Sequence, residues 1–239
     1  MSKEEIFWTE FETFDHCPLW WAWSYYTPKE EKSYTLVKDT QHLARGNATQ
    51  GLVDRWVTEG WWKLPDSAER SLWEDYLPKS VDLALEEGRR TGDPKIQKMD
   101  LWLEVRNNLG RILPKLKELF RTLGGDDFSG VTVQSQVKLA GRHKSGIILS
   151  AIADTVINWG TRVILIEGKS TRSPHKSTNY QLRWQLDCAN LQGLNTFRSH
   201  YYAFYHTGQL WEVKKDDPEQ SLWEALREKC IARILDVLS

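Results

Sequence analysis

The first half of the chain places apolar residues at the three- and four-residue spacing of amphipathic helices. We expect Pro28 to stop the first helix and Pro78 and Pro114 to break or bend the last two, because proline removes a backbone donor. Gly124–Asp127 then ends the helical half. The predicted helices cover residues 7–26, 40–62, 66–88 and 93–123.

At Val131 the spacing of apolar residues changes to strict alternation, which is typical of a half-buried strand. Richer apolar strands follow, with a hairpin turn at 158–160, then a compact helix, a second hairpin and a last helix that Pro218 opens. The chain is therefore predicted to be a single α+β domain over residues 1–239, with a mainly helical part (1–125) and a part containing a mixed sheet (126–239). The predicted strands cover residues 131–139, 145–157 and 161–170, the helix 179–193, and the second hairpin 200–213.

Composition narrows the function classes. Lys plus Arg total 32 and Asp plus Glu total 33, a formal net charge of −1, which excludes a basic arm but not a local phosphate-binding patch. No apolar run approaches the ~18 residues of a membrane span, and the N-terminus lacks the pattern of a signal peptide, so we expect no membrane association. The three cysteines, Cys17, Cys188 and Cys230, predict small buried thiols in a reducing, cytoplasmic compartment.

The candidate chemistry lies where the apolar strands turn polar. One strand carries a single carboxylate, Asp154, and the next ends in Glu167, Gly168 and Lys169. A two-residue turn at 159–160 places Asp154 opposite Leu165 and Glu167 diagonally from Asp154, about 7–8 Å away on the same face. A three-residue loop changes this register and requires a bulge to restore it.

Two carboxylates and one lysine suit metal-assisted phosphodiester hydrolysis. Mg²⁺ prefers carboxylate, carbonyl and water oxygens, and it activates a bound water while neutralising charge at the phosphate. The alternative is an ordinary salt bridge at the end of a strand, in which Lys169 only neutralises Glu167. The neighbouring Asp154, set among apolar residues, favours the first interpretation.

These motifs together resemble the PD-(D/E)XK nuclease superfamily, and within it the RecB-like exonuclease branch with its CRISPR-associated and phage relatives. Asp154 and Glu167-Gly168-Lys169 resemble the metal-binding core, and Gln181 resembles the glutamine of the following helix, although no tyrosine stands four residues later. Residues 14–18, which contain Cys-Pro, resemble the N-terminal aromatic helix, and residues 46–53 resemble the helix of the form G-x-x-x-H.

The resemblance implies a restriction-endonuclease-like mixed β-sheet flanked by helices, and a Mg²⁺- or Mn²⁺-dependent deoxyribonuclease acting on DNA ends or single strands. It implies that Lys169 and Gln181 position water and phosphate. Gln50 stands where the family has a metal-binding histidine and is a weaker oxygen ligand, while His42 lies about two helical turns away and is not a substitute. The implied metal ligands are Asp154, Glu167, the Gly168 carbonyl and Gln50, and the catalytic residues are Asp154, Glu167, Lys169 and Gln181.

Further expectations concern a cluster, the tryptophans, partners and nucleic-acid contacts. Three cysteines cannot supply the four thiolates of an iron–sulfur cluster, so no cluster is expected. Trp20, Trp21, Trp23, Trp61, Trp62 and Trp184 are assigned to the core, with base stacking as the alternative. A helicase, an annealing protein or a CRISPR-adaptation protein is a possible partner. The predicted nucleic-acid contacts are Tyr180, Arg183 and Gln185 in the helix, and Arg172 and Lys176 in the loop after the site. The alternative for the loop is an ordinary solvated segment without such contacts.

Two alternatives to an exonuclease stay open. Gln50 in the histidine position favours a catalytically weak or inactive relative that binds nucleic acid or a partner. An endonuclease on the same scaffold is the other, because a fold does not select DNA ends over internal sites.

Overall fold

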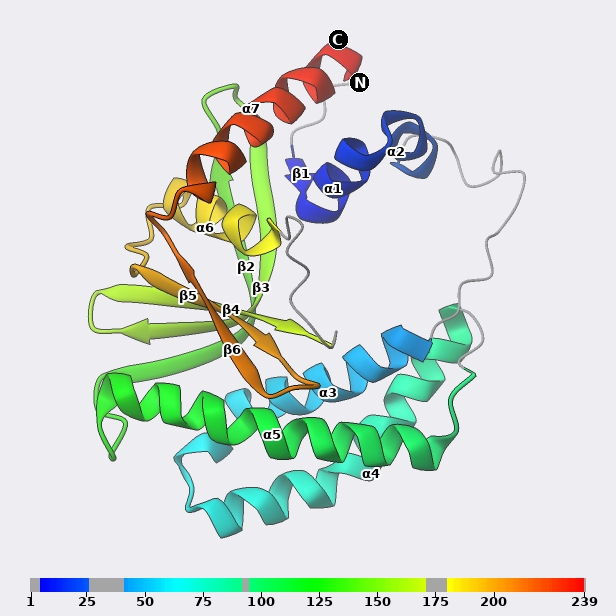
Figure 1. The fold of residues 1–239 in the computed structure, drawn as a ribbon, viewed down its shortest axis with the longest axis vertical. Helices are drawn as coiled ribbons and strands as arrows, with labels where there is room; N and C mark the ends of the chain where they lie inside the picture. The colour runs from blue at the N-terminus through cyan, green and yellow to red at the C-terminus, as the bar shows by residue number, and fades with distance from the viewer. Residues whose placement is uncertain (1–4, 26–40, 92–94, 171–179, 239) are drawn as a thin grey trace.

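The computed structural model describes residues 5–25, 41–91, 95–170 and 180–238. The chain has an α+β fold, with a helical N-terminal half and a sheet in the C-terminal half, as predicted (Figure 1). The helices are α1 (Trp8–His16), α2 (Pro18–Tyr25), α3 (Gln41–Thr58), the short 3₁₀ helix η2 (Trp61–Lys63), α4 (Asp66–Thr91), α5 (Lys98–Gly124), α6 (Gln181–Leu191) and α7 (Glu219–Leu238).

Two predicted helices are interrupted by local backbone geometry. The first breaks at Cys17, which is extended with φ −159° and ψ 104°, and Pro18 begins α2 at a position where its missing N–H costs nothing. The second ends at Thr58, because Gly60 takes a left-handed conformation with φ 71° before η2 starts. Apolar spacing alone did not reveal either break.

The two internal prolines do not break their helices. Pro78 lies inside α4 and Pro114 inside α5, and both helices continue beyond them. Leu77 and Leu113, the residues just before these prolines, are buried in the same core, and packing of this kind supplies most of the stability of a helix. A break at Pro78 is therefore wrong, and the bends expected at Pro78 and Pro114 stay predictions.

The sheet is mixed and has six strands in the order β1-β3-β4-β5-β6, with β2 also paired to β3. β4 and β5 are parallel, and α6 forms the crossover between them, while β2, β3 and β4 are antiparallel neighbours. The strands are β1 (Glu5–Phe7), β2 (Val131–Arg142), β3 (Ile148–Trp159), β4 (Arg162–Lys169), β5 (Ser199–Phe204) and β6 (Gln209–Lys214).

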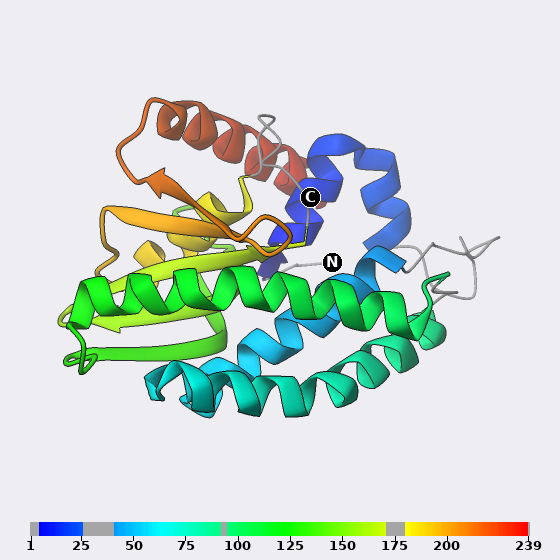
Figure 2. The same ribbon diagram turned by 60° about the horizontal axis from the view of Figure 1, so that its bottom comes forward.

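Helices cover both faces of the sheet, and each face has its own apolar core. Figure 2 shows α3, α4 and α5 on one side, with α7 and α1 on the other. Residues of β4 alternate between the two cores: Ile164 and Ile166 pack with α3–α5, whereas Val163 and Leu165 pack with α1, α6 and α7. This alternation explains why the strand is a continuous apolar run in sequence, since both of its faces are buried.

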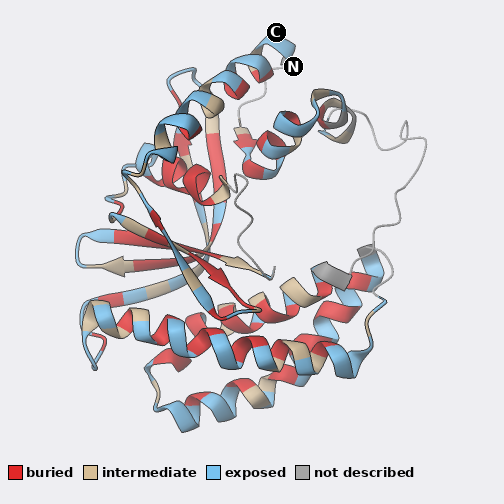
Figure 3. Ribbon diagram, viewed as in Figure 1, coloured by how far each residue is buried: buried red, intermediate tan, exposed pale blue. Residues whose placement is uncertain are grey.

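Most tryptophans are buried and serve as core residues. Figure 3 marks the buried residues in red along the helices and the strands. Trp21, Trp61, Trp62 and Trp184 are buried, which confirms the core assignment for these four. The side chains of Trp20 and Trp23 lie outside the described part of the chain. Within the described ranges, none of the helices is long and apolar enough to cross a membrane.

Candidate active site

The hairpin of β3 and β4 brings Asp154 and Glu167 together. Trp159 pairs with Arg162, so the loop is the two residues between them, and its glycine takes a left-handed conformation with φ 58°. The predicted register, with Asp154 opposite Leu165, is therefore wrong by two residues. Continuing the observed register places Asp154 directly opposite Glu167, which is closer than the diagonal arrangement predicted from sequence.

Both oxygens of the Asp154 carboxylate are hydrogen-bonded. The backbone N–H of Gly168 donates to Oδ2 at 2.8 Å, and Nε2 of Gln136 donates to Oδ1 at 3.3 Å. Burial raises the pKa of Asp154 above its usual range, and the Gly168 hydrogen bond opposes this shift. The Gly168 N–H therefore holds the Asp154 carboxylate in place, but nearby positive charge does not offset the cost of burying its negative charge.

Glu167 is nearly inaccessible, with 3% of its surface exposed, and it interacts with the lysine of its own EXK motif and with α6. Lys169 Nζ lies 3.0 Å from its Oε1, and Gln185 Nε2 donates to its Oε2 at 2.6 Å. Lys169 also donates to Gln181 Oε1 at 2.5 Å. Burial raises the pKa of Glu167 to about 7, with Lys169 acting against the shift and Asp154 adding to it.

Helix α3 closes the site from the other face of the sheet. The Tyr205 hydroxyl, just after β5, donates to Gln50 Oε1, and Gln50 Nε2 donates to Asp54 Oδ1 at 2.7 Å. Gly168 makes this approach possible, because a Cβ at this position would lie 2.0 Å from the Tyr205 hydroxyl and 2.6 Å from Gln50 Oε1. The glycine of the EXK motif is therefore required by the close packing of α3 and Tyr205 on β4.

Asp54 is a third carboxylate that sequence reasoning missed. It lies one helical turn after Gln50, and its Oδ1 is 3.4 Å from the same Gln136 nitrogen that contacts Asp154. Burial raises the pKa of Asp54 to about 6, and the nearby charge of Asp154 adds to the shift. The four-residue spacing from Gln50 was the available signal, since residues i and i+4 share a helix face.

Across the described ranges, no group of three or more His, Cys, Asp or Glu side chains is arranged to hold a metal ion. The candidate cation ligands are therefore the pair Asp154 and Glu167, completed by non-acidic oxygens such as the predicted Gly168 carbonyl. Gln50 does not present a free amide to this pair, because Tyr205 and Asp54 engage its two ends.

The structure corrects two of the predicted nucleic-acid contacts. Arg183 is buried, and its Nη2 atom lies 2.7 Å from each carboxylate oxygen of Asp217. Gln185 is fully buried and supports Glu167 instead of reaching the surface. Both side chains face the interior because α6 packs between the sheet and α7, where most of its side chains are buried.

Of the remaining predicted nucleic-acid contacts, the structure describes one and leaves two outside its described residues. Tyr180 is half-buried, with its ring centroid 4.9 Å from that of Trp223, so its contact with nucleic acid stays a prediction. Arg172 and Lys176 lie outside the described residues.

The side chain of His42 is outside the described part of the chain. Cys188 and Cys230 are buried, but Cys17 is exposed, which corrects the prediction of three buried thiols.

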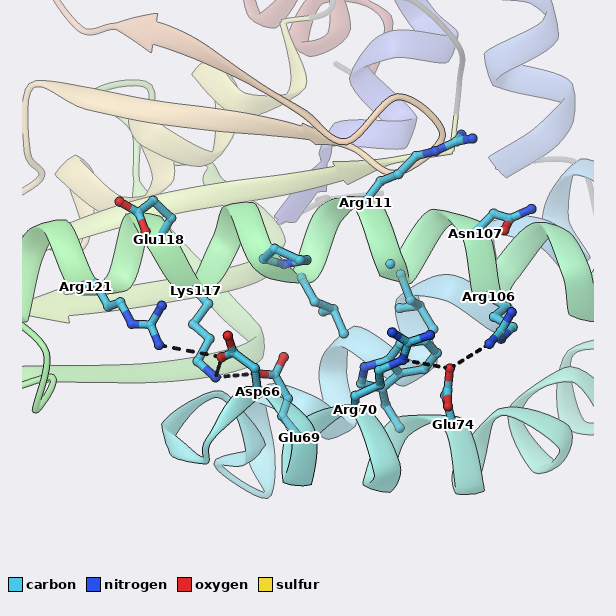
Figure 4. A pocket seen from close by; sticks show the side chains of 15 residues that line it. Asp66, Glu69, Arg70, Glu74, Arg106, Asn107, Arg111, Lys117, Glu118 and Arg121 are labelled. Carbon is cyan, nitrogen blue, oxygen red and sulfur yellow. Dashed lines mark hydrogen bonds and ion pairs between the residues drawn. The ribbon is translucent and has the colours of Figure 1, made fainter.

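A cavity of about 620 Å³ lies between α4 and α5, and it is lined by residues other than those of the candidate site (Figure 4). Its charges pair with one another: Glu74 accepts from Arg70 at 3.1 Å and from Arg106 at 3.0 Å. The buried Lys117 lies 2.5 Å from Glu69 and also pairs with Asp66. The Arg70–Glu74 pair lies within α4, whereas the pairs of Arg106 and Lys117 join α5 to α4, which makes the cavity a feature of helix packing.

Comparisons with known proteins add little to this geometry. No protein-family model matches the chain, and no curated protein matches it. Among solved structures, the crystal structure of SSO0001 is 13% identical with a TM-score of 0.30, over 85% of this chain and 80% of that chain. A similarity of this extent leaves the candidate function to the residues of the site itself.

Proposed function

We propose that the protein is a divalent-cation-dependent deoxyribonuclease that hydrolyses phosphodiester bonds, acting on DNA ends or single strands. The observation that carries the proposal is the convergence of Asp154, Glu167 and Lys169 where β4 ends, with Lys169 Nζ 3.0 Å from Glu167. Two acids from adjacent strands beside one ammonium group match the needs of a metal-assisted hydrolysis more closely than those of a solvated salt bridge, because Glu167 is nearly fully buried.

The chemistry of the donor set fits a hard cation such as Mg²⁺ or Mn²⁺. Burial raises the pKa values of Asp54, Asp154 and Glu167 together, so the positive charge of Lys169 does not offset the cost of ionising all three. In the proposal, Asp154, Glu167 and the Gly168 carbonyl hold the ion. Asp54 would join them from α3 only when its carboxylate turns away from Gln50 and Gln136, which engage it in the cation-free protein. When bound, the cation would activate a water molecule and neutralise charge at the phosphate.

The other side chains position the reacting groups. Lys169 is held between Glu167 and Gln181, and its ammonium would orient the attacking water or a phosphate oxygen. Gln185 fixes the second oxygen of Glu167, so this carboxylate has one defined orientation. These residues are well ordered by hydrogen bonds before any substrate arrives, which is the usual basis of preorganised catalysis.

The test uses end-labelled single-stranded and duplex DNA with Mg²⁺ or Mn²⁺, and the same reactions with EDTA. Glu167→Gln and Lys169→Met are expected to lower the rate by at least ~100-fold, a loss within the range for removing one stabilising group. Glu212→Gln and Lys214→Met serve as matched controls, because these exposed residues of β6 change the same charges elsewhere. Equal degradation by all five proteins would show that the nuclease activity does not come from this site.

One observation favours a second candidate, a relative that binds nucleic acid or a partner without cleaving it. The Gln50 amide, at the family's histidine position, is engaged by Tyr205 and Asp54 and so differs from a free metal ligand. DNA binding by the wild type, with no cleavage of either DNA in the presence of Mg²⁺ or Mn²⁺, would select this candidate.

A closed circular single strand completes the assay. Cleavage of the circle would select an endonuclease, whereas resistance of the circle beside digestion of the linear strand would select an exonuclease. A helicase, annealing or CRISPR-adaptation partner stays a prediction, and changes in rate on its addition would test it.

A further inference from the structure

Gln136 adopts a backbone conformation that is unusual for its place in the sheet. Its φ is 52°, although it lies in the middle of the 12-residue strand β2. The pairing with β3 is regular on both sides, with Ser135 opposite Thr155 and Val137 opposite Ala153. A non-glycine residue rarely takes this conformation, because its Cβ crowds the neighbouring carbonyl oxygen.

The conformation coincides with a change of face along the strand. Val131 and Val133 pack with the core of α3–α5, whereas Val137 and Leu139 pack with the core of α1, α6 and α7. All four are odd-numbered and would share one face in an uninterrupted strand. The strand therefore exchanges its two faces at Gln136, which lies beside Asp154 in the observed register.

The Gln136 side chain reaches two carboxylates at once. Its Nε2 atom lies 3.3 Å from Asp154 Oδ1 and 3.4 Å from Asp54 Oδ1. An amide nitrogen carries two hydrogens, so one group can donate to both oxygens. The amide thereby separates two like charges without adding a charge of its own.

We propose that Gln136 is a positioning residue whose amide nitrogen holds Asp54 and Asp154 in the cation-free protein and must release them when a divalent cation binds. The inference rests on the proposed function and deepens it. A cation that binds through Oδ1 of Asp54 and Oδ1 of Asp154 would take the two oxygens to which the amide donates. The hydrogen bonds are long and the side chain is exposed, so the amide is a weak competitor that reduces cation affinity without blocking it.

The experiment measures Mn²⁺ binding directly, from the loss of the paramagnetic resonance signal of free Mn²⁺ on titration with protein. Gln136→Leu removes the amide at similar size, and Gln136→Gly removes it where the left-handed backbone carries no strain. Gln134→Leu is the matched control, because it removes an exposed glutamine amide two residues earlier on the same strand. Both Gln136 variants are expected to bind Mn²⁺ about three- to tenfold more tightly than wild type, and the control equally to wild type.

The outcomes separate this inference from the proposed function. Tighter binding by both Gln136 variants and not by Gln134→Leu supports the inference, since damage to the fold would weaken binding. If the wild type binds Mn²⁺ and the Gln136 variants bind it equally or more weakly, the inference alone is overturned. Failure of the wild type to bind Mn²⁺ would overturn the cation-dependent function, and the role of Gln136 with it.

Discussion

His200 is expected to make the stability of the protein depend on pH. It lies in β5 with no exposed surface, and its two ring nitrogens have different partners. The backbone N–H of Leu165 donates to Nδ1 at 3.1 Å, so Nε2 carries the proton and donates to the Phe197 carbonyl at 2.8 Å. Protonation of Nδ1 would place two donors against each other inside the sheet.

The magnitude follows from the displaced pKa. Burial lowers the pKa of His200 from 6.5 to about 4, with the Phe197 carbonyl acting against the shift. Between these values the unfolded chain binds more protons than the folded one, so stability falls as the pH falls. The contribution is fully present above pH 6.5 and is lost towards pH 4, and a pKa lowered from 6.5 to about 4 corresponds to ~3 kcal/mol.

The measurement compares wild type with His200→Gln in urea unfolding, followed by tryptophan fluorescence at several pH values from 7.5 to 4.5. The comparison is needed because Asp54 and Glu167, whose pKa values are raised, act with the opposite sign: folded protein holds their protons more tightly, so they gain stability as the pH falls. Taking the difference between the two proteins cancels these shared contributions.

Wild type is expected to be the more stable protein at pH 7.5, by about 1–3 kcal/mol for the lost buried acceptor. The difference in unfolding free energy between the two proteins should move against the wild type by nearly ~3 kcal/mol as the pH approaches 4. His206→Gln, in the turn after β5, is the control for replacing a histidine outside the buried sheet. A difference between wild type and His200→Gln that stays constant over the whole range would refute the reasoning.

Three further changes test the site and the helical layer. Gly168→Ala should destabilise the fold by about 1–3 kcal/mol in urea unfolding, because the new Cβ would lie 2.0 Å from the Tyr205 hydroxyl, and Tyr205→Phe should recover part of the loss. Asp54→Asn should weaken Mn²⁺ binding about tenfold in a direct titration, and unchanged binding would remove Asp54 from the proposed site. Lys117→Met should lower the unfolding free energy by about 3–5 kcal/mol, because it leaves Glu69, 6% exposed, without its ion pair; a loss below ~1 kcal/mol would contradict this.

Local patterns were sufficient for most of the secondary structure. The change of apolar spacing at Val131 marks where helices give way to strands, because the two structures bury side chains with different periods. The breaks at Cys17 and Gly60 were missed because they depend on backbone geometry at single residues. Pro78 was expected to break or kink its helix, but α4 continues past it, because packing in the α3–α5 core outweighs the local cost of the proline.

Some residues of the candidate site were predicted correctly from sequence and others were not. Asp154, Glu167, Lys169 and Gln181 were identified from sequence, because polar residues in otherwise apolar strands mark the place where the strands line a site. In the structure Lys169 contacts both Glu167 and Gln181, and Asp154 accepts a hydrogen bond from the backbone of Gly168. Arg183 and Gln185 were misplaced on the surface, because no local pattern tells which polar side chains of α6 pair inside the fold. A helix buried between a sheet and another helix hides even charged residues.

The amino-acid sequence by itself determined the α+β class, most of the helices and strands, and the acidic and basic side chains where β4 ends. These properties depend on neighbours within a few residues, whose spacing is visible along the chain. Only the tertiary structure decided the hairpin register, the meeting of Asp54 with Asp154, and the left-handed Gln136 between them. The register depends on how the whole β3–β4 ladder pairs, and the other two features depend on contacts between residues 18 and 82 positions apart. Those contacts arise only when the strands and α3 pack together.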